Sequence, residues 1–261
     1  WDIFVPDRFL KDKIESSRAV VAISEYNRHH LTELYGDDAN HLLDKVRVIH
    51  LGVPVAEFAA LRSGTGKTAT PQIPVLLTVA RLVAKKGHLH VVDALEILRG
   101  RRFPVRWIVA GDGPERADLM ERIRAKGLSD STEFVGTVDS QHVKRLLTSA
   151  ELFVLPCTVT SEGDMDGIPV SLMEAMAAGV PVISTPVSGI PELIVNQVSG
   201  LLVEQGNAVA LADAIQLVLG DVALYDRIAS DGQNQVAEHF ELTSNVRKLK
   251  ELFEGVQTQV G

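Results

Sequence analysis

From Ile73 to about residue 220, the sequence alternates short apolar runs with amphipathic segments, and this alternation limits the possible fold more than any other feature. In the first pair, 75–80 has the pattern of a buried strand, and 87–98 that of a helix with one apolar face. Continuous apolar strands separated by amphipathic helices are typical of a parallel sheet that helices cover on both faces. The sequence therefore predicts an α/β fold with a Rossmann-like, doubly wound parallel sheet.

The remaining elements of this region follow the same order. We expect further strands at 105–110, 133–135, 152–155, 180–184 and 201–203, and further helices at 115–126, 140–148, 170–178 and 207–219. Ligands of open parallel sheets bind beyond the carboxyl ends of the strands. The predicted site therefore lies in the loops after Ala80, Ala110, Val135, Leu155 and Ser184.

We interpret the chain as four segments. Residues 1–53 hold two short strand candidates, too little sheet for a stable core, and the chain begins with Trp1 rather than Met; we therefore expect the remnant of a domain whose beginning is absent. Residues 54–73 are polar and rich in Gly and Pro, which predicts an exposed linker. Residues 74–220 form the sheet domain, and 221–261 are expected to be helical.

Composition excludes several classes of protein. The net charge of −8 and pI near 5.5 argue against a general nucleic-acid binder. No apolar run approaches the roughly 20 residues that a membrane span needs. The single cysteine, Cys157, excludes an internal disulfide and fits a reducing compartment, so we expect a cytoplasmic location. The eight histidines lack metal-ligand spacing, and we expect no metal and no other cofactor.

Two short motifs suggest other nucleotide sites, and we reject both. Gly66-Lys67-Thr68 resembles the end of a phosphate-binding loop, but Leu61 stands where its first glycine belongs. Gly111-Asp112-Gly113 resembles the start of a dinucleotide fingerprint, but Arg116 replaces its third glycine.

Two cations, Arg81 and Lys86, follow the first strand of the sheet domain, near the start of a helix. Helix N-termini favour anions, so the added positive charge predicts a diphosphate site. A solvated basic loop is the alternative.

Two acids stand eight residues apart in the loop and helix that follow the strand at 152–155. Asp166 lies in a polar, Gly-rich loop, where the amides of Gly167, Ile168 and Val170 could face a ligand. Glu174 lies in an apolar helix, and a carboxylate there can accept two hydroxyl hydrogen bonds from a ribose. A helix cap for Asp166 and a solvated position for Glu174 are the alternatives.

The other candidates are less specific. The glycines at 111 and 136 leave space for a ligand near the backbone, and Val138 could flank a flat base. Ordinary turns explain these residues equally well.

Together these residues resemble the retaining glycosyltransferases of family 4, which have the GT-B fold. Asp166-x7-Glu174 matches the family's Glu-x7-Glu motif, with a shorter first acid. The Asp-Gly-Ile-Pro variant at 166–169, followed by 188–194 (Ser-Gly-Ile-Pro-Glu-Leu-Ile), is similar to the bacterial exopolysaccharide branch of colanic-acid type.

The resemblance implies a role for each matching residue. Arg81 and Lys86 would hold the donor diphosphate, Glu174 the nucleotide ribose, and Asp166 the donor sugar. The remaining implied donor contacts are Gly111, Gly136, Val138, Gly167, Ile168, Pro169 and Val170. Residues 1–53 would end the acceptor-side domain, and the last helices would pack back toward it.

The resemblance also implies an activity. We expect a retaining hexosyltransferase that moves a sugar, without a metal, from a nucleotide-diphosphate sugar to a saccharide or lipid-linked acceptor. Any contact with the inner face of the membrane would run through the missing part of the first domain. With half the active site absent, we expect donor binding to be retained but weakened, and transfer activity to be poor. A non-catalytic nucleotide-sugar-binding domain, or another GT-B enzyme such as a nucleotide-sugar epimerase, is the alternative.

Overall fold

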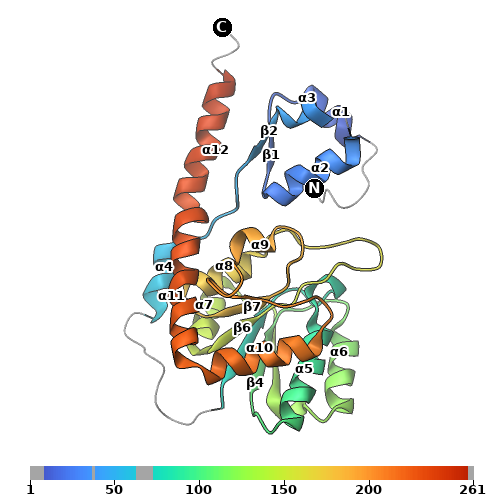
Figure 1. Cartoon of the computed structure of the whole chain (residues 1–261), viewed down its shortest axis with the longest axis vertical. Helices are drawn as coiled ribbons and strands as arrows, with labels where there is room; N and C mark the ends of the chain where they lie inside the picture. Colours follow the sequence, from blue (N-terminus) through green and yellow to red (C-terminus); the bar gives the residue numbers. More distant parts are fainter. Residues whose placement is uncertain (1–8, 37–38, 63–72, 258–261) are drawn as a thin grey trace.

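The computed structural model describes residues 9–36, 39–62 and 73–257 (Figure 1). Its largest part is a six-stranded, all-parallel sheet with the strand order β5-β4-β3-β6-β7-β8. The strands are β3 (Val75–Val79), β4 (Arg106–Ala110), β5 (Thr132–Gly136), β6 (Leu152–Val154), β7 (Val182–Ser184) and β8 (Leu201–Leu202). The predicted doubly wound, Rossmann-like sheet is confirmed.

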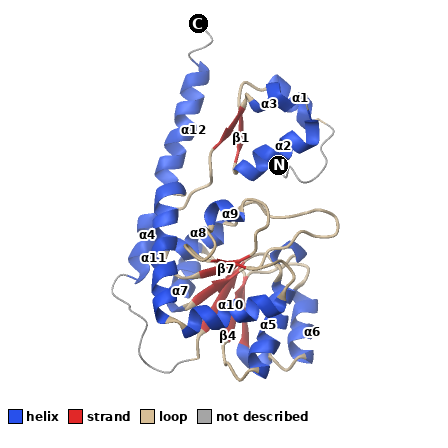
Figure 2. Cartoon of the chain, in the orientation of Figure 1, coloured by secondary structure: helices blue, strands red, loops and turns tan. Residues whose placement is uncertain are grey.

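Helices enclose this sheet on both faces (Figure 2). One face carries α5 (His88–Gly100), α6 (Arg116–Ala125) and α10 (Ala208–Gly220); the other carries α7 (Ser140–Ser149), α8 (Val170–Ala177) and the end of α11 (Val222–His239). Successive strand side chains point to opposite faces. Leu76 and Leu77 of β3 accordingly join different core clusters, and both are fully buried.

Residues 9–50, which we call the first unit, surround a two-stranded parallel sheet of β1 (Val20–Ala22) and β2 (Val46–Val48). Its helices are α1 (Leu10–Ser16), α2 (Glu25–Tyr35) and α3 (Ala39–Leu43). A small apolar cluster of its own holds it together: Ile14, Ala22, Leu31, Leu42 and Val46.

The expectation of an exposed linker over 54–73 is wrong for its first half. α4 (Val55–Ala59) and the 3-10 turn η2 (Ala60–Arg62) follow the first unit directly, and the Phe58 side chain is only 4% exposed. The apolar residues Val55, Phe58 and Leu61 are three positions apart, so one face of this turn packs on the core. Residues 63–72, with Gly66-Lys67-Thr68, lie outside the described residues.

The end of the chain is helical to residue 257, as expected, with α12 (Leu242–Gln257) extending beyond the sheet domain (Figure 1). At the junction of α11 and α12, Val53 pairs with Glu241 as a short parallel bridge. Among the described residues, no single helix is long and apolar enough to cross a membrane; α10 and α11 together reach that length and composition, with a 99° bend between them.

Candidate functional site

The sheet has its topological switch point between β3 and β6. These strands are neighbours, but the chain continues from β3 to β4 on one side and from β6 to β7 on the other. Loops diverge at such a point and leave a crevice at the carboxyl edge of the sheet. The loop after β3 contacts the loop after β6 here, since the Thr158 amide donates to the Lys85 carbonyl at 2.9 Å.

Lys86 and Asp166, predicted separately, form an ion pair between these two loops. Lys86 Nζ lies 2.7 Å from Asp166 Oδ2, and the two side chains are only 15% and 17% exposed. Beside them, Lys85 Nζ lies 2.9 Å from Asp164 Oδ1 and 4.0 Å from Asp166 Oδ1. The β3 loop therefore presents two lysines to two acids of the β6 loop.

Arg81 stands apart from these pairs. It lies two residues after the end of β3, is exposed, and makes no side-chain hydrogen bond or ion pair with any residue that the structure describes. A guanidinium near the switch point that pairs with no described residue is available to an anionic ligand.

The β6 loop ends at the start of α8. Ile168 is buried, Pro169 is the N-cap residue, and Val170 begins the helix with 40% of its surface exposed. Within the described part of the chain, the amides of Val170 and Ser171 have no hydrogen-bond acceptor. Free amides at a helix start attract negative charge, so α8 adds to the positive field of the lysines.

Glu174 lies in the second turn of α8 between buried neighbours, Met173 and Ala175. Glu174 is half-buried, and its carboxylate makes no hydrogen bond or ion pair with the described residues. Burial raises the pKa of its carboxyl group, and the positive charge of Lys144 opposes that shift. The Glu174 carboxylate is therefore partly removed from water, and no described residue donates a hydrogen bond to it.

The glycine candidates differ in their surroundings. Gly111 has a φ of +141°, and a Cβ there would lie 1.9 Å from the Ala80 carbonyl oxygen, so close packing against the end of β3 explains this glycine. Gly136 has a φ of +72° and open space around it. A Cβ on Gly167 would lie 3.2 Å from Ile23 Cδ1 of the first unit. Val138 is half-buried and packs on the core.

Cys157 is fully buried beside this site, with its sulfur 3.7 Å from Asp166 Oδ2. Burial raises the pKa of the thiol to about 12, and the negative charge of Asp166 adds to the shift. Since the thiolate is the nucleophilic form, burial and the raised pKa both disfavour a nucleophilic role for Cys157.

Sequence reasoning missed three residues around the site. Lys85 forms an ion pair with Asp164 of the β6 loop, and the positive charge of Lys144 of α7 opposes the rise in the pKa of Glu174. Glu192 of α9 (Ile190–Leu193) contacts the first unit. Lys85 could have been found from the sequence, because it directly precedes Lys86, which was predicted as a site residue. Glu192 lies in the 188–194 segment that carries the resemblance, but nothing in the sequence indicates its contacts with the first unit, and Lys144 had no signal.

An apolar cavity of about 560 Å³ lies at the opposite edge of the sheet. Its lining includes Val75, Val105 and Arg106, at the amino ends of β3 and β4. Because ligands of such sheets bind at the carboxyl edge, the cavity is not the candidate site.

Comparison with known proteins identifies the family. The family model "Glycosyl transferases group 1" matches residues 67–235. The chain belongs to this family. Over 220 residues it is 36% identical to the putative colanic acid biosynthesis glycosyltransferase WcaL of Salmonella typhimurium, covering 80% of this chain and 54% of that protein. Over 170 residues it is 40% identical to the amylovoran biosynthesis glycosyltransferase AmsK of Erwinia amylovora, covering 65% and 40%. The chain thus spans about half the length of these relatives.

Solved structures agree on the fold of this group 1 glycosyltransferase chain. A glycosyltransferase from Rickettsia africae superposes with a TM-score of 0.80 at 24% identity, covering 97% of this chain and 68% of that one. Anabaena Alr3699/HepE, solved with UDP and glucose, gives 0.76 at 21% identity, covering 97% and 69%. The family expected from Asp166-x7-Glu174 is confirmed.

Proposed function

We propose that this chain forms the donor-binding part of a retaining glycosyltransferase, which moves a sugar from a nucleotide-diphosphate sugar to a saccharide or lipid-linked acceptor. Relatives named for colanic acid and amylovoran biosynthesis favour exopolysaccharide synthesis as its process. One observation carries the proposal: the Lys86–Asp166 pair lies at the switch point. Arg81 and the first amides of α8, which have no hydrogen-bond or ion-pair partner among the described residues, supply further positive potential.

The diphosphate of the donor would bind to Arg81, Lys86 and the start of α8. Its charge competes with Asp166 for Lys86, and a displaced Asp166 is free to accept hydrogen bonds from the sugar. During transfer, the bond between the anomeric carbon and the phosphate oxygen breaks, and the acceptor oxygen bonds to that carbon. The acceptor proton passes to the departing phosphate. The two cations and the helix start stabilise the charge that develops there, so we expect no metal.

The nucleoside would lie along α8. Glu174 has the partly desolvated carboxylate that two ribose hydroxyls satisfy. The open side of Gly136 and the neighbouring Val138 leave room for a base. The acceptor would approach from the side of the first unit. Any contact with the inner face of a membrane would lie on the same side.

A donor screen tests the proposal. The protein is incubated with nucleotide sugars and saccharide acceptors, products are identified by mass spectrometry, and their anomeric configuration is read by NMR. Glu174→Ala should lower turnover at least about tenfold, because lost contacts to a desolvated carboxylate are worth about 1.5–3 kcal/mol.

Lys126→Ala serves as the control, since Lys126 pairs with Asp93 and Glu96 at the far edge of the sheet domain. It should leave turnover unchanged, and thermal unfolding should show that both variants fold. Donor binding without transfer by this chain fits a donor-binding part; the same result with a complete acceptor-side domain present would indicate the non-catalytic binding domain instead. A product of inverted configuration would contradict retention.

A further inference from the structure

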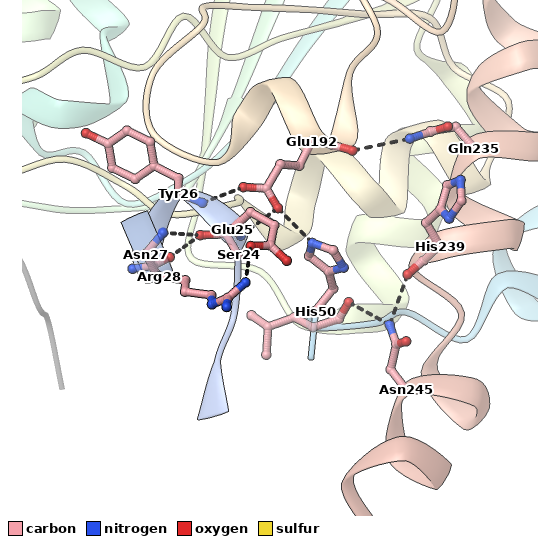
Figure 3. A network of polar contacts seen from close by, with 11 residues as sticks. Ser24, Glu25, Tyr26, Asn27, Arg28, His50, Glu192, Gln235, His239 and Asn245 are labelled. Carbon is pink, nitrogen blue, oxygen red and sulfur yellow. Dashed lines mark hydrogen bonds and ion pairs between the residues drawn. The ribbon is translucent and has the colours of Figure 1, made fainter. Parts of the chain in front are cut away.

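The Glu192 carboxylate joins the sheet domain to two segments of the first unit (Figure 3). Its Oε2 accepts from the Glu25 amide at 2.9 Å, and its Oε1 accepts from the Tyr26 amide at 2.9 Å. His50 Nε2 lies 2.8 Å from Oε2. The Glu192 and His50 side chains are only 22% and 24% exposed, which shields these contacts from water.

These contacts complete the hydrogen bonding at the start of α2. A helix leaves its first four amides without intrahelical acceptors. The Asn27 amide donates to Ser24 Oγ at 3.0 Å, and the Arg28 amide donates to the Ser24 carbonyl at 3.3 Å. The two earlier amides depend on Glu192, so a residue of the sheet domain caps a helix of the first unit. A carboxylate is also the favourable charge at this end of the helix dipole.

The start of α2 lies directly on the donor side of the sheet domain. A Cβ on Gly189 would lie 2.9 Å from Ser24 Cβ and 2.8 Å from Ile168 Cγ1, so these three residues pack tightly together. The Tyr26 hydroxyl lies 3.6 Å from the Met165 sulfur. Met165 and Ile168 flank Asp166 in the sequence, and Glu192 therefore fixes the first unit against the donor loop, which we define as residues 164–168.

Both ends of the Glu192 contact are anchored. Gln235 Nε2 of α11 donates to the Glu192 carbonyl at 3.2 Å, which holds α9 in place. The His50 ring packs on Phe240 with 4.8 Å between centroids. Asn245, which is 4% exposed, donates to the Leu51 carbonyl at 3.3 Å and holds the chain where it crosses between the two units (Figure 3).

We propose that Glu192 is a positioning residue for sugar transfer. It touches none of the groups assigned to the donor; it docks the start of α2 and His50, and through them it sets the distance between the first unit and the donor loop. The kinetic part of this inference rests on the proposed transferase function. The docking of the two units does not depend on that function and can be measured separately.

The test compares Glu192→Ala and Glu192→Gln with the wild type. Amide hydrogen exchange by NMR should speed up at least about tenfold at Glu25 and Tyr26 in Glu192→Ala, because both amides lose their acceptor. Glu192→Gln keeps one acceptor oxygen, so its exchange rates at these amides should lie between those of the wild type and of Glu192→Ala. The dissociation constants of UDP and GDP should stay within twofold of the wild type. In Glu192→Ala, turnover should fall about tenfold while the donor KM stays unchanged. Partial recovery of turnover in Glu192→Gln would distinguish a positioning role from a loss of folding.

The matched control is Glu121→Ala, at an exposed position of α6. It should change neither exchange nor turnover. Unchanged exchange at Glu25 and Tyr26 in Glu192→Ala would overturn the docking role. Faster exchange with full turnover would overturn the positioning role. If the wild type neither binds UDP or GDP nor transfers sugar, the proposed function fails, while the exchange data still decide whether Glu192 docks the first unit.

Discussion

His88 is a buried polar side chain whose pKa affects stability. It follows Lys86 and Gly87 at the start of α5, is 1% exposed, and neither ring nitrogen has a hydrogen-bond partner among the described residues. Burial lowers the pKa of its imidazole from 6.5 to about 4, and the positive charge of Lys86 adds to the shift. The unfolded chain therefore takes up this proton first as the pH falls. Its contribution to stability is complete above pH 6.5 and decreases from there down to about pH 4.

This shift predicts a pH dependence of unfolding. Between pH 7.5 and pH 5, the wild type should lose about 2 kcal/mol of unfolding free energy through this group alone, at about 1.4 kcal/mol per pKa unit. The glutamine in His88→Gln does not titrate, so over the same pH range this variant should lose about 2 kcal/mol less unfolding free energy than the wild type. Urea unfolding at both pH values measures the difference. An equal loss in the two proteins would show that His88 does not carry the shift, and His29→Gln, at an exposed position, controls for the loss of any histidine.

α4 and α12 bear apolar side chains in opposite surroundings. Phe58 of α4 is buried between α8 and α7, at 4% exposed, whereas Phe253 of α12 is 61% exposed. Phe58→Ala should lower the unfolding free energy by about 3 kcal/mol or more, because it removes buried surface and leaves a cavity. Phe253→Ala is the matched control and should change it by less than about 0.5 kcal/mol. Denaturant titration compares them, and equal effects would contradict the packing of α4 on the core.

The elements that could be predicted were those with a strong period. The strands at 75–80 and 105–110 and the helix at 87–98 were located nearly to the residue, because a buried parallel sheet requires continuous apolar runs. α4 and α9 were missed. Each is five residues or fewer and forms because the core covers it, so it has little periodic signal of its own.

The same distinction holds for the site. That Lys86 and Asp166 lie near each other follows from the sequence, because each comes after a strand that ends at the same edge of the sheet, but their ion pair at 2.7 Å was not predicted. The contacts of Glu192 with Glu25 and His50 could not be predicted, because they span 167 and 142 residues of sequence. Such contacts depend on how two folded units meet, and no local pattern encodes that.

The molecule as a whole consists of a sheet domain with a core cluster on each face of its sheet and a smaller unit with its own cluster, and among the described residues two sets of contacts join them (Figure 1). One is the crossing at Val53, whose amide donates to the Phe240 carbonyl at 2.9 Å; the other is Glu192. Both lie on the side of the sheet domain where the carboxyl ends of its strands meet. The arrangement places the start of α2 over the loop that carries Asp166, which is where an acceptor would have to approach a bound donor.

The central claim is that Arg81, Lys86 and the start of α8 bind a nucleoside diphosphate. Calorimetric titration of the protein with UDP and GDP tests it most directly, with Lys86→Ala as the variant and Lys126→Ala as the control. We predict heat of binding with at least one nucleotide, a dissociation constant about 10–100-fold weaker in Lys86→Ala, and no change in Lys126→Ala. No heat with either nucleotide, or equal affinity in Lys86→Ala and the wild type, would contradict the claim.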